Sequence, residues 1–358
     1  MWKSLKDRAE GVKEMKRMKT TEAVGQVLCH DITQIIPGVT KDAVFRKGHI
    51  IREEDIPVLL SVGKDSVYIW ENDETMMHEN DAAEVLYRMT ANEHMHPSDV
   101  KEGKIEVIAD TEGLLKVDRE KLKKVNAFGE MMIATRHGNT VVKKGDKLAG
   151  TRIIPLVIKK DKMQEAEKIC DGTPILKILP FTVKKAAIIT TGNEVYHGRI
   201  KDAFTPVIEQ KIAEFGAEMM FHEIFDDNDR KITDGCLRAI EAGADIVFCT
   251  GGMRVDPDDK TPLAIKNTGA EMISYGSPVL PGAMFLLSYY RKGDKVIPIC
   301  GLPGCAMYNR RTIFDLVLPR LMAADPVTAD ELASLGEGGL CLNCKVCTFP
   351  NCGFGKGW

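Results

Sequence analysis

The sequence predicts an α/β protein with two main parts. A β-rich α+β region, in one or two subdomains, is expected over residues 1–175, and a three-layer α/β/α domain with a mostly parallel sheet over residues 184–330. From residue 186 onward, strand patterns alternate with helix patterns, and such alternation requires crossovers that cover both faces of a parallel sheet. Before residue 160, short strand patterns are separated by Gly or Asp turns. A chain of 358 residues with 44% apolar content can bury two or three domain cores.

The N-terminal region is expected to contain short strands and two helices. Strand patterns cover residues 63–70, 104–110 and 139–158. Helical periodicity covers residues 80–90 and 118–128. Residues 170–185 combine Pro and Gly with a basic pair, so we expect them to form the link to the second domain.

The second domain is expected to consist of four strands and four helices in alternation. For the first helix, Thr205 is the expected cap, Pro206 suits the first turn, and Gly216 can end the helix. The strands are predicted at 186–192, 217–225, 244–252 and 294–304, and the helices at 205–216, 227–243, 261–269 and 305–322.

Charge and hydropathy exclude two classes of partner. Lys plus Arg number 49 against 52 for Asp plus Glu, which argues against a bulk nucleic-acid binder. The basic start, residues 1–20, favours an exposed helix or tail over a membrane or nucleic-acid patch. No apolar run reaches the roughly 18 residues of a membrane span, and no apolar signal core begins the chain. We therefore expect a cytoplasmic protein with reduced thiols and no membrane partner.

Three predicted strands of the second domain end in glycine turns. These turns are "TTGNE" at 190–194, "CTGG" at 249–252 and "CGLPG" at 300–304. In a doubly wound sheet, ligands lie outside the carboxyl ends of the strands, and glycine lets backbone amides approach them closely. A helix start that follows such a turn offers unpaired N–H groups to an anion. One such turn is more often an ordinary loop, but three at corresponding strand ends favour a phosphate-bearing ligand.

Three carboxylates follow the second turn, at Asp256, Asp258 and Asp259. Solvated residues at a helix N-terminus explain such acids equally well, and for Asp258 this is the preferred explanation. Acids beside a phosphate loop need a cation between the two charges, and hard oxygen ligands suit Mg²⁺. Glu194, after the first strand, is the fourth candidate for this role.

The ordered motifs resemble a known family. "ITTGNEV", "CTGG…DPDD" and "CGLPG", in this order and spacing, are similar to the molybdopterin-binding domain of the MoeA and gephyrin E-domain type, the molybdopterin molybdenumtransferases. "RHGNTVVKKGDKLAGTRIIP" is similar to a further segment of that family, R-x-x-G-x-x-V-x-x-G-D. The resemblance covers residues 186–323 well and the N-terminal half loosely.

This resemblance implies a function in molybdenum cofactor biosynthesis. Members bind adenylylated molybdopterin and molybdate, insert the metal at the dithiolene and release AMP with a divalent cation, Mg²⁺ here, commonly as homodimers. It implies a catalytic role for Asp259, and we expect Glu194 and Asp256 to join it because they lie beside the glycine turns. It implies ligand contacts for Thr191, Gly192, Asn193, Thr250, Gly251, Gly252, Gly301, Leu302, Pro303 and Gly304. Arg254 is a further candidate for a phosphate contact.

Several positions depart from the family pattern. Arg254 and Asp256 stand where Ser and Gly are usual, "LPGAMF" lacks the lysine of P-G-K-P, and Cys305 follows G-L-P-G in place of Asn. The sequence therefore leaves three functions open. The first is a molybdenum-inserting enzyme. The second is a non-catalytic molybdopterin carrier or molybdoenzyme maturation chaperone. The third is an unrelated nucleotide-binding α/β enzyme.

A cysteine-rich tail, residues 336–358, ends the sequence. Cys341, Cys344, Cys347 and Cys352 have the spacing C-x2-C-x2-C-x4-C. This spacing is close to that of the cysteines that bind an iron–sulfur cluster in bacterial ferredoxins. Four thiolates also suit a tetrahedral zinc ion. The sequence therefore leaves an iron–sulfur cluster, zinc and a metal-free reduced tail as alternatives. Few apolar residues surround the cysteines, so we expect metal binding to supply most of the order of the tail. We consider a molybdoenzyme as the binding partner of this tail.

Overall fold

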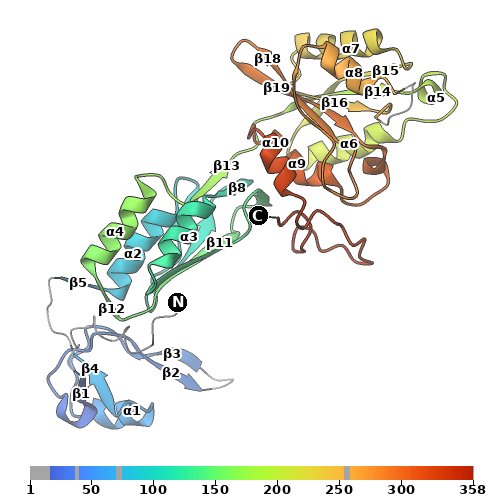
Figure 1. Ribbon diagram of the computed structural model, residues 1–358. Coiled ribbons are helices and arrows are strands. Elements are labelled where there is room, and N and C mark those ends of the chain that lie inside the picture. The colour runs from blue at the N-terminus through green and yellow to red at the C-terminus, as the bar shows by residue number, and fades with distance from the viewer. Residues whose placement is uncertain (1–16, 37–39, 70–74, 254–258, 358) are drawn as a thin grey trace.

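The computed structural model describes residues 17–36, 40–69, 75–253 and 259–357. Figure 1 shows three parts in a row, with the chain running from the first to the third. The basic start lies largely outside the described residues, at 1–16. Within the described residues, no helix combines the length and the apolar character needed to cross a membrane.

The first part is small and has its own core. Leu28, Ile51 and Leu59 are buried at its centre. Strand β1 pairs with β4 and β2 pairs with β3, both antiparallel. Its elements are β1 (Arg17–Lys19), η1 (Thr20–Glu22), β2 (Ile32–Ile36), β3 (Thr40–Phe45), α1 (Asp55–Ser61) and β4 (Ser66–Tyr68).

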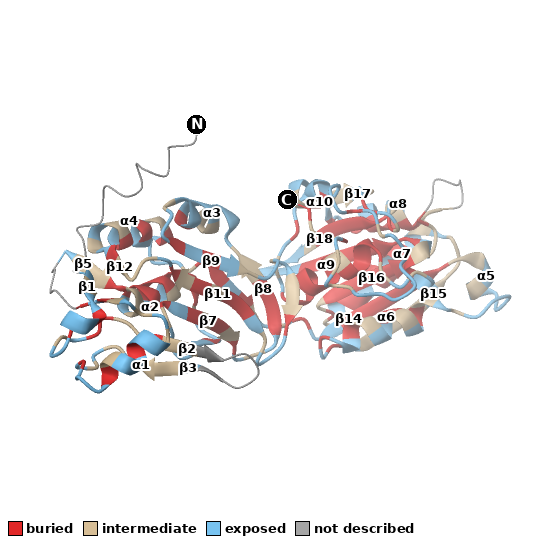
Figure 2. Ribbon diagram, turned by 90° about the horizontal axis from the view of Figure 1, so that it is seen from below, coloured by how far each residue is buried: buried red, intermediate tan, exposed pale blue. Residues whose placement is uncertain are grey.

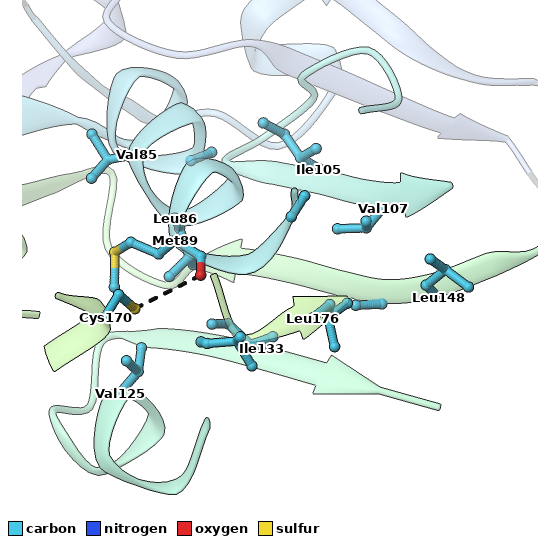
Figure 3. Packing of buried hydrophobic residues seen from close by; sticks show 14 of the residues in the cluster. Val85, Leu86, Met89, Ile105, Val107, Val125, Ile133, Leu148, Cys170 and Leu176 are labelled. Atoms are coloured by element: carbon cyan, nitrogen blue, oxygen red, sulfur yellow. Dashed lines mark hydrogen bonds between the residues drawn. The ribbon is translucent and has the colours of Figure 1, made fainter. Parts of the chain in front are cut away.

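The second part packs three helices against short antiparallel sheets. Figure 3 shows Leu86 and Met89 of one helix in the same core as Ile105 and Val107 of a strand, with Cys170 beside Met89, all buried. Two of the helices confirm the predicted helical stretches at 80–90 and 118–128. The elements are β5 (Met76–His78), α2 (Glu79–Thr90), β6 (Met95–Pro97), β7 (Lys104–Ala109), β8 (Gly113–Val117), α3 (Arg119–Ala127), β9 (Met131–Thr135), β10 (Thr140–Val142), β11 (Lys147–Ile153), β12 (Val157–Lys159), α4 (Lys160–Cys170) and β13 (Leu176–Leu179).

The stretch expected to be a link contains a strand. Strand β13 lies within residues 170–185 and pairs antiparallel with β8, with Leu176 opposite Val117. Leu176 and Ile178 are buried while Lys177 between them is exposed. This alternation has the period of a half-buried strand, and the flanking Pro and Gly obscured it in the sequence.

The third part is the predicted three-layer α/β/α domain. Its six-stranded sheet has the order β15-β14-β16-β19-β18-β17. The first three pairings are parallel and the last two antiparallel. Helices α6 and α9 pack on one face and α7 and α8 on the other. The elements are β14 (Lys185–Thr191), α5 (Asn193–Tyr196), α6 (Phe204–Ala213), β15 (Glu218–Phe225), α7 (Asp229–Glu241), β16 (Ile246–Thr250), α8 (Thr261–Asn267), β17 (Glu271–Tyr275), β18 (Leu286–Lys292), β19 (Lys295–Leu302), η2 (Gly304–Met307), α9 (Ile313–Met322) and α10 (Ala329–Ser334).

This arrangement confirms the predicted fold class and adds an antiparallel edge that the sequence did not predict. Strands β17 and β18 were missed because no helix pattern separates β18 from β19. Instead the two strands form a hairpin with Lys292 opposite Lys295. Figure 2 shows that buried residues concentrate in the sheet and beneath its helices.

Two helix starts differ from the prediction. Helix α6 begins at Phe204, and the carboxylate of Asp202 accepts the backbone N–H groups of Phe204 and Thr205, so Thr205 is not the cap. The helix predicted over 305–322 is divided into η2 and α9. Thr312 caps α9 because its hydroxyl accepts the N–H of Phe314, while Asp315 accepts the N–H of Thr312.

The cysteine-rich tail packs against the third part. Phe354 is 5% exposed and belongs to the same buried cluster as Phe314 of α9. Phe349 and Cys352 are partly buried against this cluster. The expectation that the tail has few apolar partners is therefore wrong, because one aromatic ring anchors it in the domain core.

Candidate functional site

The three glycine turns leave the same edge of the sheet. Thr190 of β14 lies beside Thr250 of β16, and Thr250 lies beside Leu302 of β19. From β14 the chain passes through α6 to β15 on one side and then through α7 to β16 on the other side. The edge between β14 and β16 is thus a topological switch point, where open α/β sheets bind their ligands.

The first turn is tied to the second by a buried hydroxyl. Thr191 is 4% exposed, and its hydroxyl lies 3.0 Å from the carbonyl oxygen of Thr250 and 3.1 Å from the hydroxyl of Thr261. The backbone N–H of Asn193 donates to the carboxylate of Asp227 at 3.1 Å. Glu194 follows on α5 and is exposed.

The glycines of the second turn make room for protein atoms. Gly251 has a φ of +82°, and a Cβ atom there would lie 2.1 Å from the carbonyl oxygen of Thr191. Gly252 has a φ of +54°, and its Cβ would lie 2.9 Å from the hydroxyl oxygen of Thr261. At these two positions the absent side chains therefore make room for Thr191 and Thr261. The backbone groups of both residues remain candidates for ligand contact.

The two glycines of the third turn have different surroundings. Leu302 is fully buried, and a Cβ on Gly301 would lie 2.5 Å from the Cε atom of Met253. Pro303 is also buried. Gly304 is exposed, and a side chain there would meet no atom within 4 Å. Leu302 could therefore contact a ligand only through its backbone, whereas Gly304 faces open space.

The acidic residues of the second motif are described only in part. Arg254 and Asp256 lie outside the described residues. Asp259 is half-buried just before α8. Burial raises the pKa of Tyr275, and the nearby carboxylate of Asp259 raises this pKa further. The Tyr275 hydroxyl donates to the carbonyl oxygen of Met253 at 3.0 Å, so this tyrosine, which the sequence did not single out, holds the second turn.

A polar cluster beside the first turn was also missed. The ring Nε2 of His222 lies 3.1 Å from the hydroxyl oxygen of Thr190 and 3.2 Å from that of Thr205. Asp202 accepts both hydroxyls, at 3.0 Å from Thr190 and 2.6 Å from Thr205. The cluster lies directly behind the end of β14 and fixes the start of α6 against it.

Hydrogen bonding keeps Asp202 ionised. Burial acts to raise the pKa of Asp202, but hydrogen bonds from Thr205, Thr190 and the N–H of Phe204 outweigh it, so this pKa lies below its usual value. The sequence signal was an Asp placed shortly before a helix pattern, which is typical of a capping residue.

The tail cysteines do not form a compact ion site. Cys344 and Cys347 are exposed, and Cys341 and Cys352 are half-buried. Across the ranges described, no three side chains of His, Cys, Asp or Glu gather closely enough to hold a metal ion.

A cavity of about 730 Å³ lies outside the three turns. It is lined by Val117 and Asn139 of the second part and by Pro319 and Phe354 of the third part and tail. Lys116 joins the same two parts, because its Nζ lies 2.7 Å from the carboxylate of Asp325. None of the residues predicted to bind the ligand lines this cavity.

The fold and the three convergent turns define a doubly wound α/β domain whose glycine turns meet at its switch point. Residues 187–323 match a family described as "Probable molybdopterin binding domain". Residues 17–71 match a family described as a domain of unknown function. The molybdopterin-binding match supports the resemblance seen in the sequence, while the narrower likeness to MoeA and gephyrin stays a prediction.

Curated relatives match part of the chain. The chain is 30% identical over 129 residues to a "Putative competence-damage inducible protein" of Bacillus cereus (strain B4264), which covers 36% of this chain and 30% of the relative. It is 32% identical over 85 residues to a protein of the same name from Bacillus subtilis (strain 168), covering 24% and 20%. The matches thus span less than a third of the length of these relatives.

Among solved structures, part of the chain is similar to the tungsten cofactor synthesizing protein MoaB from Pyrococcus furiosus. The TM-score is 0.34 at 19% identity, over 40% of this chain and 95% of that chain. A molybdenum cofactor biosynthesis protein from the same organism covers 90% of this chain and 66% of its own, with a TM-score of 0.24 at 13% identity.

Proposed function

We propose that the third part binds molybdopterin, in free or adenylylated form, at the turns after β14, β16 and β19, and that the chain functions in molybdenum cofactor biosynthesis. The observation that carries this proposal is the match of residues 187–323 to the molybdopterin-binding family. The position of the three turns at the switch point supports it, because that edge is where such sheets bind phosphate-bearing ligands.

Each turn would supply a different kind of contact. Gly304 would let the opposite wall approach the ligand closely because it carries no side chain. In the first turn, the backbone N–H groups of Gly192 and Asn193 already donate to Phe225 and Asp227, so this turn would contact the ligand through its side chains. Backbone groups of Gly251 and Gly252 would contribute without moving, since contacts with Thr191 and Thr261 hold them in place. Such a pre-formed site loses little entropy when the ligand binds.

Magnesium would join the site together with the ligand. Mg²⁺ is usually held by one or two carboxylates, several waters and substrate phosphates. Asp259 and Glu194 are the described carboxylates we propose for this role, with Asp256 as a third. The described residues alone hold no three-ligand group, so phosphate oxygens would have to complete the coordination.

The catalytic step is a separate proposal. If the domain inserts molybdate, adenylylated molybdopterin and molybdate are its substrates and AMP is released. The missing P-G-K-P lysine supports the alternative of a carrier that binds the pterin without cleaving it. The name of the Bacillus relatives does not mention molybdopterin. The test of ligand binding therefore also includes AMP, a nucleotide without a pterin.

The deciding experiment titrates purified full-length protein with molybdopterin, adenylylated molybdopterin and AMP, and then measures AMP release with molybdate and Mg²⁺. Binding with AMP release supports the transferase, and binding of the pterin without release supports the carrier. Binding of AMP but of neither pterin would overturn the proposal in favour of a nucleotide enzyme.

A matched pair of glycine variants locates the site. Gly304→Val should weaken pterin binding at least tenfold, because the side chain would extend from an exposed turn into the proposed ligand space. Gly150→Val, on β11 of the second part, also enters open space and should bind as wild type does. Equal affinities in the two variants would place the ligand elsewhere.

A further inference from the structure

All four tail cysteines line one cavity. Cys341, Cys344, Cys347 and Cys352 surround a space of about 520 Å³, together with residues 308–311 of the segment that precedes α9. We propose that this cavity is the binding site of an iron–sulfur cluster of the four-iron class, with one cysteine sulfur on each iron. The site is independent of the proposed pterin site.

The arrangement of the cysteines around a cavity favours an iron–sulfur cluster over a single zinc ion as its occupant. Zinc binds four thiolates at about 2.3 Å, which brings tetrahedral sulfurs to within about 3.8 Å of one another. As reported above, no three described ligand side chains come together in this way. A cluster has a body of its own and binds each thiolate through a different iron, so its cysteines surround a space instead of meeting at a point.

Positive charge lies beside the cysteines. Arg310, Arg311 and Lys345 line the same cavity. The Arg311 guanidinium lies 4.8 Å from the ring centre of Phe349, a residue of the tail. Four iron-bound thiolates give a cluster site net negative charge, which the adjacent cations would offset.

The arginine is fixed before any cluster binds. Arg311 lies 2.8 Å from the carboxylate of Asp315, which is 4% exposed at the start of α9. Phe354 anchors the end of the tail in the core of the domain. The cavity walls are thus held by protein contacts, and the cluster would add to a pre-formed site.

Loading requires no change of oxidation state in the protein. An assembled cluster, delivered by a carrier, would exchange its carrier ligands for the four cysteine sulfurs. Each thiol would form one iron–sulfur bond and lose its proton to solvent or to the departing carrier thiolate. Two of the sulfurs belong to exposed residues, so the cavity is accessible to a donor.

The test uses the full chain purified without oxygen and reconstituted with iron and sulfide. We expect about four iron and four acid-labile sulfide per chain, visible sulfur-to-iron absorption, and an electron paramagnetic resonance signal after reduction. Cys344→Ala and Cys347→Ala should lose most of the iron. Cys305→Ala, which removes a half-buried cysteine outside the tail, should keep it.

Circular dichroism has to show that each variant is folded. One zinc per chain without iron, no metal at all, or iron content unchanged in both tail variants would overturn the proposal. Pterin binding measured on the same samples distinguishes failure here from failure of the proposed function, because the two sites share no residue.

Discussion

A Cβ atom on Gly251 would lie 2.1 Å from the carbonyl oxygen of Thr191, so the turn after β16 rests on the end of β14 through backbone contact. The hydroxyl of Thr191 also donates a hydrogen bond to the carbonyl oxygen of Thr250, the residue before Gly251. Two strand ends at the switch point are therefore locked together by one glycine and one threonine. The glycine of the second turn thus has a structural role in joining the two turns.

Gly251→Ala is expected to destabilise the protein strongly. Its φ of +82° strains any side chain, and the new methyl group would overlap Thr191. Strain and overlap together should cost about 3 kcal/mol or more. Gly269→Ala is the matched control, because Gly269 has a φ of +84° but no atom near its Cβ position, so it should lose only about 1 kcal/mol. Urea unfolding measures both, and equal losses would contradict the contact.

The anchoring of the tail can be tested with one aromatic residue. Phe354→Ala should lower the free energy of unfolding by about 3–5 kcal/mol, because the ring is 5% exposed in the cluster beneath α9. Leu342→Ala, at a tail residue that is 77% exposed, should change it by less than about 0.5 kcal/mol. If removal of the ring leaves the unfolding midpoint unchanged, the tail is not part of this core. Cutting the chain after Gly336 should then likewise leave the domain stable.

The sequence predicted the parts of the fold that depend on local pattern. The strand–helix alternation from residue 186 and the glycine turns at three strand ends correctly placed β14, β16 and β19. β13 and the β17–β18 pair were missed because their strands are recognisable only by their partners. Strand β13, for example, becomes part of a sheet by pairing with β8, about sixty residues earlier.

The roles of individual residues were harder to predict for the same reason. A glycine after a strand has the same sequence signature whether the adjacent space holds a ligand or a protein atom. Gly251 and Gly304 illustrate the two cases, since only the structure places Thr191 beside the first and nothing beside the second. Likewise, Tyr275 has no motif, and its importance comes from a hydrogen bond to Met253 across the fold.

Asp259→Asn should lower the pKa of Tyr275, since the Asp259 carboxylate opposes ionisation of the tyrosine. The pKa should stay above that of a free tyrosine, because burial is the larger cause of its elevation. Absorbance titration, with Tyr275→Phe subtracted to isolate this residue, measures the change. Glu271→Gln removes an exposed acid at the other end of β17 and should leave the titration as it is. A Tyr275 pKa that does not respond to Asp259→Asn would mean that the carboxylate lies further away.

The last prediction concerns the acid dependence of the switch-point edge. Asp202 accepts hydrogen bonds from two hydroxyls and two backbone N–H groups, so Asp202→Asn should cost about 1–3 kcal/mol at neutral pH. The folded-state pKa of Asp202 is lowered, so the unfolded chain takes up the proton first as the pH falls. The stabilisation is therefore fully present above the ordinary Asp pKa of about 3.9 and is lost as the pH falls through the lower folded-state value.

The measurement is the difference in unfolding free energy between wild type and Asp202→Asn at a series of pH values. This difference should be constant near neutral pH and shrink below about pH 4. Asp234→Asn, at an exposed carboxylate on α7, serves as the control and should stay within about 0.5 kcal/mol of wild type throughout. A difference for Asp202→Asn that persists unchanged into acid would show that the loss arises from packing. In that case the charge of Asp202 would not hold α6 against the end of β14.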